Sequence, residues 1–275
     1  MDQEKKPIEY IDIHSHLNFP DYEADFNDLL ERMEISKVAT ITVGTDLESS
    51  RRAVQLAEKY SNLYACIGQH PEDNATESFD QVEYEKLLQH PKIVAIGECG
   101  LDFFRLTKKL ANNEIEQEGF ENEKKRQKEL FKKQIDLAIK YNKPLMIHAR
   151  DAYREILEIL DEYFNMYGAK LRGNAHFFAG TLDEAKAFLK IGFTLSFTGV
   201  ITFARQYDEL IKYVPLESLH IETDAPFVTP VPYRGERNEP SYVVEVAKKM
   251  AEIKDLDLDT VKIQLLKNSK RLFGI

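Results

Sequence analysis

The sequence predicts an α/β fold of the (β/α)8 TIM barrel class, with extra helices at the C-terminal end. Eight short runs of apolar and β-branched residues recur along the 275-residue chain, and stretches with helical spacing of apolar residues separate most of them. Strand–helix alternation repeated in this way indicates parallel strands joined by right-handed crossovers. No linker or low-complexity tract interrupts it, so we expect one domain over residues 1–275.

The strands are expected where β-branched and aromatic residues cluster between Gly, Pro or polar residues. In chain order they lie at residues 8–13, 38–43, 63–67, 93–96, 144–147, 170–175, 193–197 and 219–221. Between strands, apolar residues recur at helical spacing, as they do at Phe26, Leu29, Leu30 and Met33. The expected helices lie at residues 21–35, 47–60, 79–88, 151–164, 182–190 and 204–213, and two more, at 241–253 and 257–273, finish the chain.

One polar stretch departs from this alternation. Residues 103–123 follow the fourth predicted strand and are long for a loop between a strand and a helix, which usually has about 2–6 residues. We expect a loop that overhangs the carboxyl end of that strand. Its role is open between a lid that grips substrate and a solvated insertion. Its acidic distal part is expected to repel a continuous phosphate backbone.

The composition, with 43% hydrophobic and 31% charged residues, is that of an ordinary globular protein. A formal net charge of −10 argues against a broad basic surface that wraps nucleic acid, but it is compatible with a nucleic-acid end held by metals and a few local cations. The start, MDQEKKPIEY, lacks the apolar segment of a signal peptide, and no apolar run is long enough to span a membrane. The two cysteines, Cys66 and Cys99, argue against a disulfide scaffold and favour a reducing cytoplasm.

Residues of metal-binding type stand where predicted strands end. In a (β/α)8 barrel the carboxyl ends of the strands converge on the face that holds the active site. The first pair of histidines has the i, i+2 spacing that directs both imidazoles to the same side of a strand. Four histidines and two carboxylates are too many ligands for one cation and suit two. The six predicted ligands are His14, His16, Glu98, His148, His176 and Asp224.

Six sequence blocks resemble the signature motifs of the TatD family of metal-dependent hydrolases and deoxyribonucleases, which belongs to the amidohydrolase-like barrels. They occur in order through nearly the whole chain: IDIHSHL, IGQHP, VAIGECGLDF, MIHARDA, AHFFAG and IETDAPFVTPVPYRGERNEP. GECGLDF and the last block are the most specific. The chain keeps the first H-x-H motif, which some members of the family lose, and the stretch after GLDF is longer than is usual in the family.

This resemblance implies a centre with two divalent cations. It implies two ligand sets, which are His14, His16, Glu98 and Asp224 for one cation, and Glu98, His148 and His176 for the other. Glu98 would bridge the cations, because a carboxylate offers two oxygens. Asp224 would bind one cation and orient the attacking water as general base. Nitrogen and oxygen ligands leave the metal open among zinc, manganese, iron and, more weakly, magnesium.

Further polar residues are expected around the ligands. Glu222 is a candidate for fixing the orientation of a ligand imidazole. His70 follows the third strand. Three roles are open for it, namely a metal ligand, a substrate contact or a polar residue at the rim, and substrate contact is favoured. Arg150 either grips a phosphate oxygen or pairs with Asp151 or a neighbouring loop. Barrels of this class often bind phosphate in the loops after strands seven and eight, and the candidates there are Arg205, Tyr233 and Arg234.

The leading functional hypothesis is a divalent-metal-dependent phosphodiesterase, a TatD-like deoxyribonuclease that removes nucleotides from DNA ends in the 3′ to 5′ direction. The expected partners are DNA ends or short oligonucleotides, with phosphate or a nucleotide as product, and a monomer without a membrane partner is favoured. The alternative is a metal-dependent amide, lactone or aminoacyl-ester hydrolase, because a carbonyl substrate needs only one polarising cation and an apolar pocket. A non-catalytic metal scaffold is disfavoured, because structural metal sites are usually closed.

Overall fold

The computed structural model describes residues 7–72 and 78–275. The expectation that the chain has no signal peptide rests partly on residues 1–6, which lie outside the described residues. Among the described residues, eight parallel strands form one sheet in the order β1-β2-β3-β4-β5-β6-β7-β8. The strands are β1 Tyr10–Ser15, β2 Val38–Val43, β3 Leu63–Ile67, β4 Ile93–Asp102, β5 Leu145–Arg150, β6 Gly173–Ala175, β7 Thr194–Phe197 and β8 Leu219–Ile221. The α-helices are α1 Phe26–Ile35, α2 Leu47–Lys59, α3 Gln81–Leu87, α4 Phe104–Ala111, α5 Gln117–Lys140, α6 Tyr153–Tyr167, α7 Leu182–Lys190, α8 Asp208–Tyr213, α9 Val243–Lys254 and α10 Leu258–Phe273.

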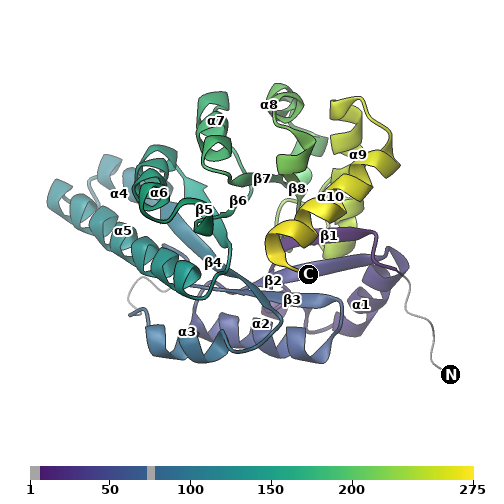
Figure 1. Ribbon diagram of the computed structural model, residues 1–275, viewed down its shortest axis with the longest axis horizontal. Helices are drawn as coiled ribbons and strands as arrows, with labels where there is room; N and C mark the ends of the chain where they lie inside the picture. Colours follow the sequence, from purple (N-terminus) through teal and green to yellow (C-terminus); the bar gives the residue numbers. More distant parts are fainter. Residues whose placement is uncertain (1–6, 73–77) are drawn as a thin grey trace.

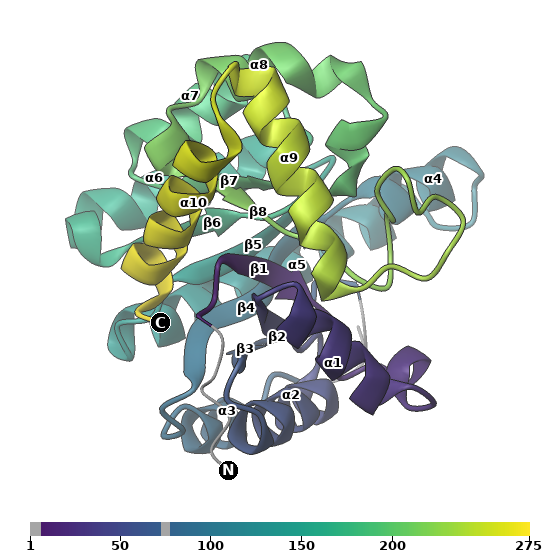
Figure 2. The same ribbon diagram turned by 90° about the vertical axis from the view of Figure 1, so that its right-hand side faces the viewer.

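The sheet closes into a barrel between its first and last strands. Ser15 forms a parallel bridge with Ala225, just beyond β8. The His16 N–H donates to the Ala225 carbonyl at 2.8 Å, and the Asp224 N–H donates to the His14 carbonyl at 2.9 Å. Helices surround the strands (Figures 1 and 2), and α9 and α10 follow the last strand, so the predicted (β/α)8 class with extra C-terminal helices is confirmed. No helix in the described part of the chain has the length and apolar character needed to cross a membrane.

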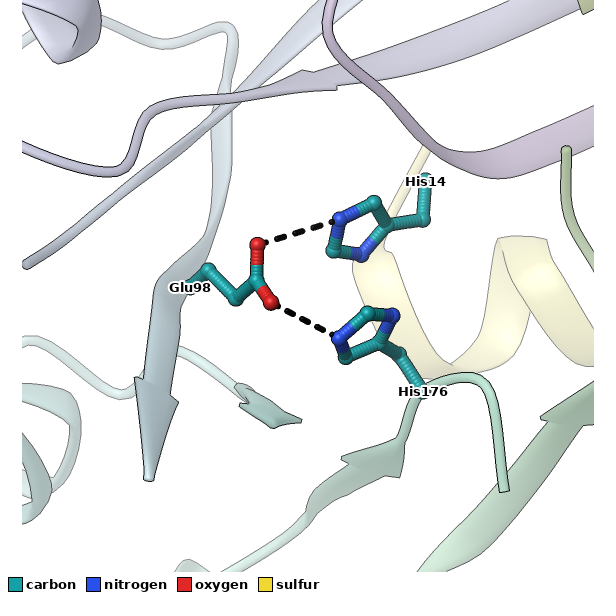
Figure 3. Close-up of side chains that lie close together, drawn as sticks. All are labelled: His14, Glu98 and His176. Carbon is teal, nitrogen blue, oxygen red and sulfur yellow. Dashed lines mark hydrogen bonds and ion pairs between the residues drawn. The ribbon is translucent and has the colours of Figure 1, made fainter. Parts of the chain in front are cut away.

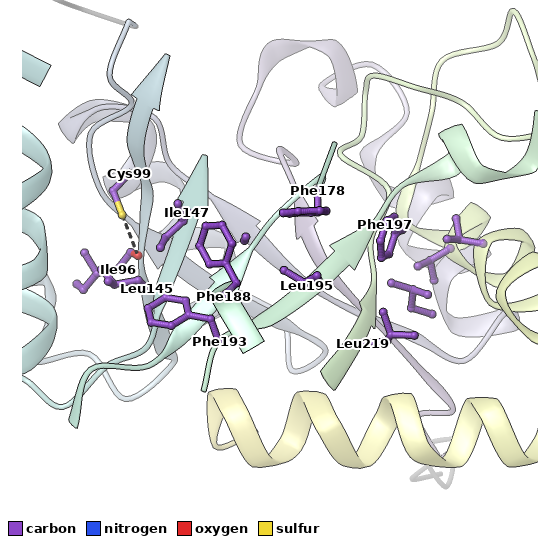
Figure 4. Close-up of a cluster of buried hydrophobic side chains, with 14 of the residues drawn as sticks. Ile96, Cys99, Leu145, Ile147, Phe178, Phe188, Phe193, Leu195, Phe197 and Leu219 are labelled. Atoms are coloured by element: carbon purple, nitrogen blue, oxygen red, sulfur yellow. Dashed lines mark hydrogen bonds between the residues drawn. The ribbon is translucent and has the colours of Figure 1, made fainter. Parts of the chain in front are cut away.

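Apolar side chains fill the space between the strands and the surrounding helices. Leu145 and Ile147 of β5, together with Leu195 of β7, belong to the same buried cluster as Phe188 of α7 (Figure 4). The Phe188 ring lies 6.1 Å from the ring of Phe193, in a tilted arrangement. Burying a side chain of this size contributes about 1.5–3 kcal/mol. This packing fixes the strands as a rigid frame for the residues at their carboxyl ends.

Strand β4 runs to Asp102, beyond the end predicted from sequence at Ile96. Its pairing with β5 shifts register between Ile96 and Cys99, where a bulge interrupts the ladder. An ideal Cβ on Gly100 would lie 2.0 Å from the His148 carbonyl oxygen, and Gly100 has a φ of +139°. Only glycine allows this close approach of two backbones. The glycines of GECG therefore permit the strand to continue through Glu98 to Asp102, whereas the sequence analysis ended it at Ile96.

The predicted polar loop at residues 103–123 is wrong. Most of that stretch is helical, because it contains α4 and the first turns of α5. Good helix formers are common in it, with five Glu, two Lys, two Leu and one each of Gln, Arg and Ala among its 21 residues. Leu106 is buried, and Ile115 and Phe120 pack against the core. High polarity was taken as a sign of a loop, but a short apolar stripe is enough to dock an otherwise exposed helix.

Candidate metal centre

Four side chains from three parts of the barrel form a first group of donor atoms. The His14 Nε2 lies 3.3 Å from His16 Nε2, 3.4 Å from Glu98 Oε2 and 3.7 Å from Asp224 Oδ1. The His16 Nε2 lies 3.7 Å from Glu98 Oε2 and 3.5 Å from Asp224 Oδ1. Donors about 2.1 Å from a tetrahedral centre lie roughly 3.4 Å from one another. The spacing of this group therefore fits a single cation.

The other oxygen of Glu98 faces a second group. The Glu98 Oε1 lies 2.9 Å from His148 Nδ1, 2.9 Å from His176 Nε2 and 3.7 Å from His70 Nε2. Figure 3 shows the Glu98 carboxylate reaching from β4 between His14 and His176, with one oxygen directed at each. The His14 and His176 rings stack with their centroids 3.9 Å apart. One carboxylate is thus shared by two sets of nitrogen donors.

Neighbouring groups hold several of these rings in orientation. The His16 Nδ1 lies 2.9 Å from the Val43 carbonyl, which leaves its Nε2 directed at the centre. Glu222 accepts a hydrogen bond from the Phe177 N–H at 2.5 Å, and its Oε1 lies 3.6 Å from His176 Nδ1. Partners of this kind fix the tautomer and the ring orientation of metal-binding histidines. Glu222 thus lies beside the ring of His176, and its role in orienting that ring stays a prediction.

Asp102 holds His148 from the side opposite Glu98. Its Oδ2 lies 2.9 Å from His148 Nε2. The backbone of Asp102 is itself fixed, because Gln127 accepts from its N–H at 2.9 Å and donates to its carbonyl at 3.0 Å. The two nitrogens of His148 therefore face two carboxylates. This arrangement fixes the position of the His148 imidazole within the second donor group.

The buried charged groups of the centre need neighbouring groups of opposite charge. Burial raises the pKa of Glu98, but the positive charge of His176 and hydrogen bonds from His14 and His148 outweigh it, so the pKa lies well below its usual range. Burial also works against a charged His148, yet Asp102 and Glu98 raise its pKa to about 9. A buried carboxylate that stays ionised needs positive charge beside it. Divalent cations fit this donor set in charge as well as in spacing.

A cleft of about 470 Å3 opens above the two donor groups. Its lining includes five of the six ligand candidates, all except His14, and a rim of aromatic and basic side chains, among them Phe19, Phe227, Arg105 and Arg150. The centre is therefore open on one side, unlike a closed structural metal site. A substrate can reach Asp224, whose side chain is 13% exposed.

The comparison with protein families decides what this barrel is. The model of the family described as "TatD related DNase" matches residues 11–274. The chain belongs to the TatD family. The match includes all six ligand candidates, so the resemblance seen in the sequence blocks is confirmed.

Similar proteins extend over nearly the whole TatD-family chain. The metal-dependent hydrolase YabD of Bacillus subtilis is 40% identical over 270 residues, which are 96% of this chain and 98% of YabD. The metal-dependent hydrolase TatD of Mycobacterium tuberculosis is 34% identical over 274 residues, covering 96% and 98% of the two chains. The crystal structure of YJJV, a TatD homolog from Escherichia coli, has a TM-score of 0.83 and 30% identity, covering 97% and 98%. The protein is therefore a TatD-family metal-dependent hydrolase.

Two of the five predicted substrate contacts in this TatD-family cleft line it, and three do not. His70 lies in the lining, and burial lowers its pKa to about 3. Arg150 also lines the cleft, but it stacks on Phe104 at 3.7 Å instead of pairing with Asp151. The remaining three contact other parts of the fold and stand outside the lining, namely Arg205, Tyr233 and Arg234.

Local partners hold those three side chains in the structure, and their role as substrate contacts stays a prediction. Arg205 lies 3.4 Å from Asp208 and 3.7 Å from Glu252. Tyr233 stacks on Tyr242 with centroids 4.0 Å apart. Arg234 donates to the carbonyl of Thr229 at 2.7 Å. Sequence placed these residues in the correct loops, but their direction depends on contacts with α9 and within the loop.

Four residues of the site were missed. Asp102 belongs to β4 and lies four residues after Glu98. Had the strand been continued through GECG, this even spacing would have placed both side chains on the same side of the strand. Phe19 and Phe227 follow the HSH and TDAP segments closely, so proximity to predicted ligands was their only signal. Arg105 was assigned to the polar loop. It is exposed on α4 beside the cleft, with its Nε 3.5 Å from Glu72.

Proposed function

We propose that this TatD-family hydrolase is a phosphodiesterase that removes nucleotides from DNA ends in the 3′ to 5′ direction. The proposal includes two divalent cations, one held by the donor group of His14, His16, Glu98 and Asp224, and one by Glu98, His148 and His176. Zinc, manganese or iron suits these nitrogen and oxygen donors, and magnesium suits them less well. The proposal also includes a cytoplasmic location. Cys66 and Cys99 are buried and form no disulfide, which supports a reducing compartment.

The observation that supports two cations most strongly is the position of Glu98. Its Oε2 lies 3.4 Å from His14, and its Oε1 lies 2.9 Å from both His148 and His176. A carboxylate that serves one cation does not need nitrogen donors around both oxygens. When bound, two cations would lower the pKa of a water and stabilise negative charge on the phosphate oxygens.

The residues of the chain can carry out the proton transfer that hydrolysis needs. Asp224 is ionisable, partly exposed to the cleft and next to the first donor group, so it can accept a proton from the attacking water. The water oxygen forms a new bond to phosphorus, the bond from phosphorus to the 3′ oxygen breaks, and that oxygen gains a proton. Arg105 and Arg150 at the rim offset the charge of the phosphates.

A metal-reconstituted assay tests this function. Purified protein is analysed for bound elements, stripped with a chelator and reloaded with Mn²⁺, Zn²⁺ or Mg²⁺, and then given single-stranded DNA labelled at either end. We expect nucleotide release from the 3′ end, loss of activity on stripping and recovery on reloading. Hydrolysis that survives complete removal of metal contradicts the proposal. Turnover of lactones or amides without cleavage of any phosphodiester would assign the alternative chemistry to this barrel.

A further inference from the structure

Strand β2 carries none of the six ligand candidates, yet the turn at its carboxyl end contacts three residues of the site. Three consecutive carbonyls, those of residues 43–45, each accept a hydrogen bond from one of these residues. The donors, in the same order, are Nδ1 of His16 at 2.9 Å, the backbone N–H of Glu98 at 3.0 Å and the backbone N–H of His70 at 2.8 Å. Residues 43–45, called here the β2 turn, therefore contact residues of both donor groups.

Asn18 holds the β2 turn against the start of helix α2. Its side-chain amide donates to the Val43 carbonyl at 3.1 Å and to the Ser49 carbonyl at 2.9 Å. Its oxygen accepts from Thr42 Oγ1 at 3.2 Å. The side chain is buried, and rotating the amide by half a turn would place its oxygen against two carbonyls. The hydrogen bonds therefore allow Asn18 a single orientation.

The β2 turn fits closely against α2, which covers the outside of β2 and β3 (Figure 1). An ideal Cβ on Gly44 would lie 2.4 Å from Ser50 Oγ and 2.6 Å from Ser50 Cα, so only glycine fits there. The Thr45 N–H donates to Ser49 Oγ at 2.9 Å. Asp46 caps the helix by accepting from the Ser49 N–H at 2.7 Å. The turn is thus attached to a helix end whose own polar groups have partners.

The His16 ring is held at its edge and at its face. A carbonyl oxygen can only accept, so a neutral His16 carries its proton on Nδ1, toward Val43, and presents the lone pair of Nε2 to the first donor group. The Phe19 ring stacks on the His16 ring with centroids 4.6 Å apart and an interplanar angle of 13°. The two residues that fix the edge and the face, Asn18 and Phe19, follow the HSH segment directly.

We propose that Asn18 is a positioning residue of the metal centre, which acts on His16 through the Val43 carbonyl. By holding that carbonyl, Asn18 directs Nε2 of His16 at the first donor group. By holding the β2 turn, it also fixes the backbone of Glu98, which both donor groups share. The inference rests on the proposed function only in that it requires a cation at His16, and it is independent of the substrate.

The chain contains a matched control for the loss of this amide. Asn268 is also buried, donates to the carbonyls of Leu216 and Leu219 at 2.7 and 2.8 Å, and accepts from Gln264 at 2.7 Å. These bonds lie at the amino end of β8, away from the strand ends that carry the donor groups. Asn18→Ala and Asn268→Ala therefore remove the same kind of side chain, and only the first should change the metal centre.

Calorimetric titration of stripped protein with Zn²⁺ tests the role. His16→Ala identifies the binding step that depends on His16. Asn18→Ala should weaken that step about tenfold, the lower end of the usual effect of losing a partner behind a metal-binding histidine, because the amide acts through a carbonyl. Asn268→Ala should keep the wild-type affinity, although both alanine variants should lower the urea midpoint of unfolding.

A spectroscopic signal separates positioning from stability. In zinc-saturated protein with ¹⁵N-labelled histidine, the Nδ1 proton of His16 is protected from solvent by its bond to the Val43 carbonyl. That proton should exchange faster in Asn18→Ala than in the wild type, and at the wild-type rate in Asn268→Ala. An unchanged exchange rate in Asn18→Ala overturns the inference.

Wild-type zinc affinity in Asn18→Ala also overturns it, even if the urea midpoint falls as in Asn268→Ala. An equal loss of affinity in Asn268→Ala would overturn it as well, because the effect would then follow from stability alone. If Asn18→Ala does not fold, Asn18→Ser decides, since its hydroxyl can donate to only one carbonyl: weaker zinc binding than in the wild type supports the role, and equal binding overturns it. A wild type without any binding step that depends on His16 contradicts the ligands of the proposed function, and the inference with them.

Discussion

At the residue scale, His148 depends on Asp102 for its place in the centre. The imidazole has one nitrogen 2.9 Å from Glu98 and the other 2.9 Å from Asp102. Asp102→Ala should weaken binding of one of the two proposed cations about 10–100-fold, the usual effect of losing a carboxylate behind a metal-binding histidine. Asp102→Asn keeps an oxygen that can accept from the ring and should retain most of the affinity. Calorimetric titration of stripped protein measures both, and equal affinity in all three proteins would remove Asp102 from this role.

Asp224 has a different role, because it reaches both the first donor group and the cleft. Asp224→Asn keeps the size and one oxygen but removes the basic group. Single-turnover hydrolysis should slow by about 10²–10⁴-fold. Asp183→Asn is the control, because Asp183 is an exposed aspartate whose side chain is 91% accessible. Near-normal turnover in Asp224→Asn at full metal content would place the general base elsewhere.

The spacing of residues was enough to find the donor atoms of the centre but not all of their supports. His14 and His16 lie on one side of a strand by the period of two, and strand ends converge in a barrel, so distances within the centre follow from topology. Asp102 was missed because the glycines around Glu98 were read as the end of the strand. Arg234 donates to a carbonyl in its own loop and is not part of the cleft lining, and the sequence gave no signal of that bond.

At the scale of elements, helix α5 fixes two strand ends through glutamine side chains one above the other. Gln127 makes two hydrogen bonds with the backbone of Asp102, at 2.9 and 3.0 Å. Gln134, two turns later, makes the same pair with the backbone of Gln69, at 2.8 and 2.9 Å. Each amide satisfies one N–H and one carbonyl beyond or at the end of a strand. The helix therefore sets the positions of β4 and of the segment that leads to His70.

Removing either amide leaves buried backbone groups without these partners. Gln127→Ala and Gln134→Ala should each lower the free energy of unfolding by about 1–3 kcal/mol. Gln117→Ala, at the exposed start of the same helix, should change it by no more than about 0.5 kcal/mol. Urea denaturation compares the three variants with the wild type. Stabilities for Gln127→Ala and Gln134→Ala that match Gln117→Ala would show that the paired bonds contribute little.

Helices α4 and α5 also show where sequence prediction failed at this scale. Apolar periodicity located the strands and the amphipathic helices, because these bury a regular stripe or run. The stretch from 103 to 123 is mostly exposed and polar, and this polarity was given more weight than the helical spacing of Phe103, Leu106 and Leu110 and the helix preference of its residues. The consequence is functional as well as structural, because a basic helix now stands where an acidic loop was expected.

At the scale of the whole molecule, ion pairs connect the two ends of the chain around the barrel closure. Asp25, before α1, accepts two hydrogen bonds from Arg237 at 2.7 Å and one from Arg32 at 3.0 Å. Glu9 pairs with Lys262 of α10 at 2.8 Å. The contacts of Arg237 and Lys262 join segments more than 200 residues apart in the sequence. They hold the segment after β8 against the first part of the barrel, beside the closure between β1 and Ala225.

The same ion pairs predict how stability depends on acidity. Hydrogen bonds from Arg237, and then from Arg32, lower the pKa of Asp25 from 3.8 to about 2, in spite of burial. Since the folded state holds the lower pKa, the stabilisation is complete above about pH 4 and disappears as the pH falls to about 2. Asp25→Asn should therefore have a lower Tm than the wild type at pH 6, and the difference should vanish near pH 2.

Thermal melts of the wild type, Asp25→Asn and the exposed control Asp161→Asn between pH 2 and pH 7 measure this dependence. A proton taken up by Asp25 on unfolding is the physical reason, because the unfolded chain binds it at a pH where the folded chain does not. The control should follow the wild type at every pH. A constant difference in Tm between Asp25→Asn and the wild type across the whole range would mean that the neutral hydrogen bonds of the side chain, and not its charge, tie the two ends of the chain together.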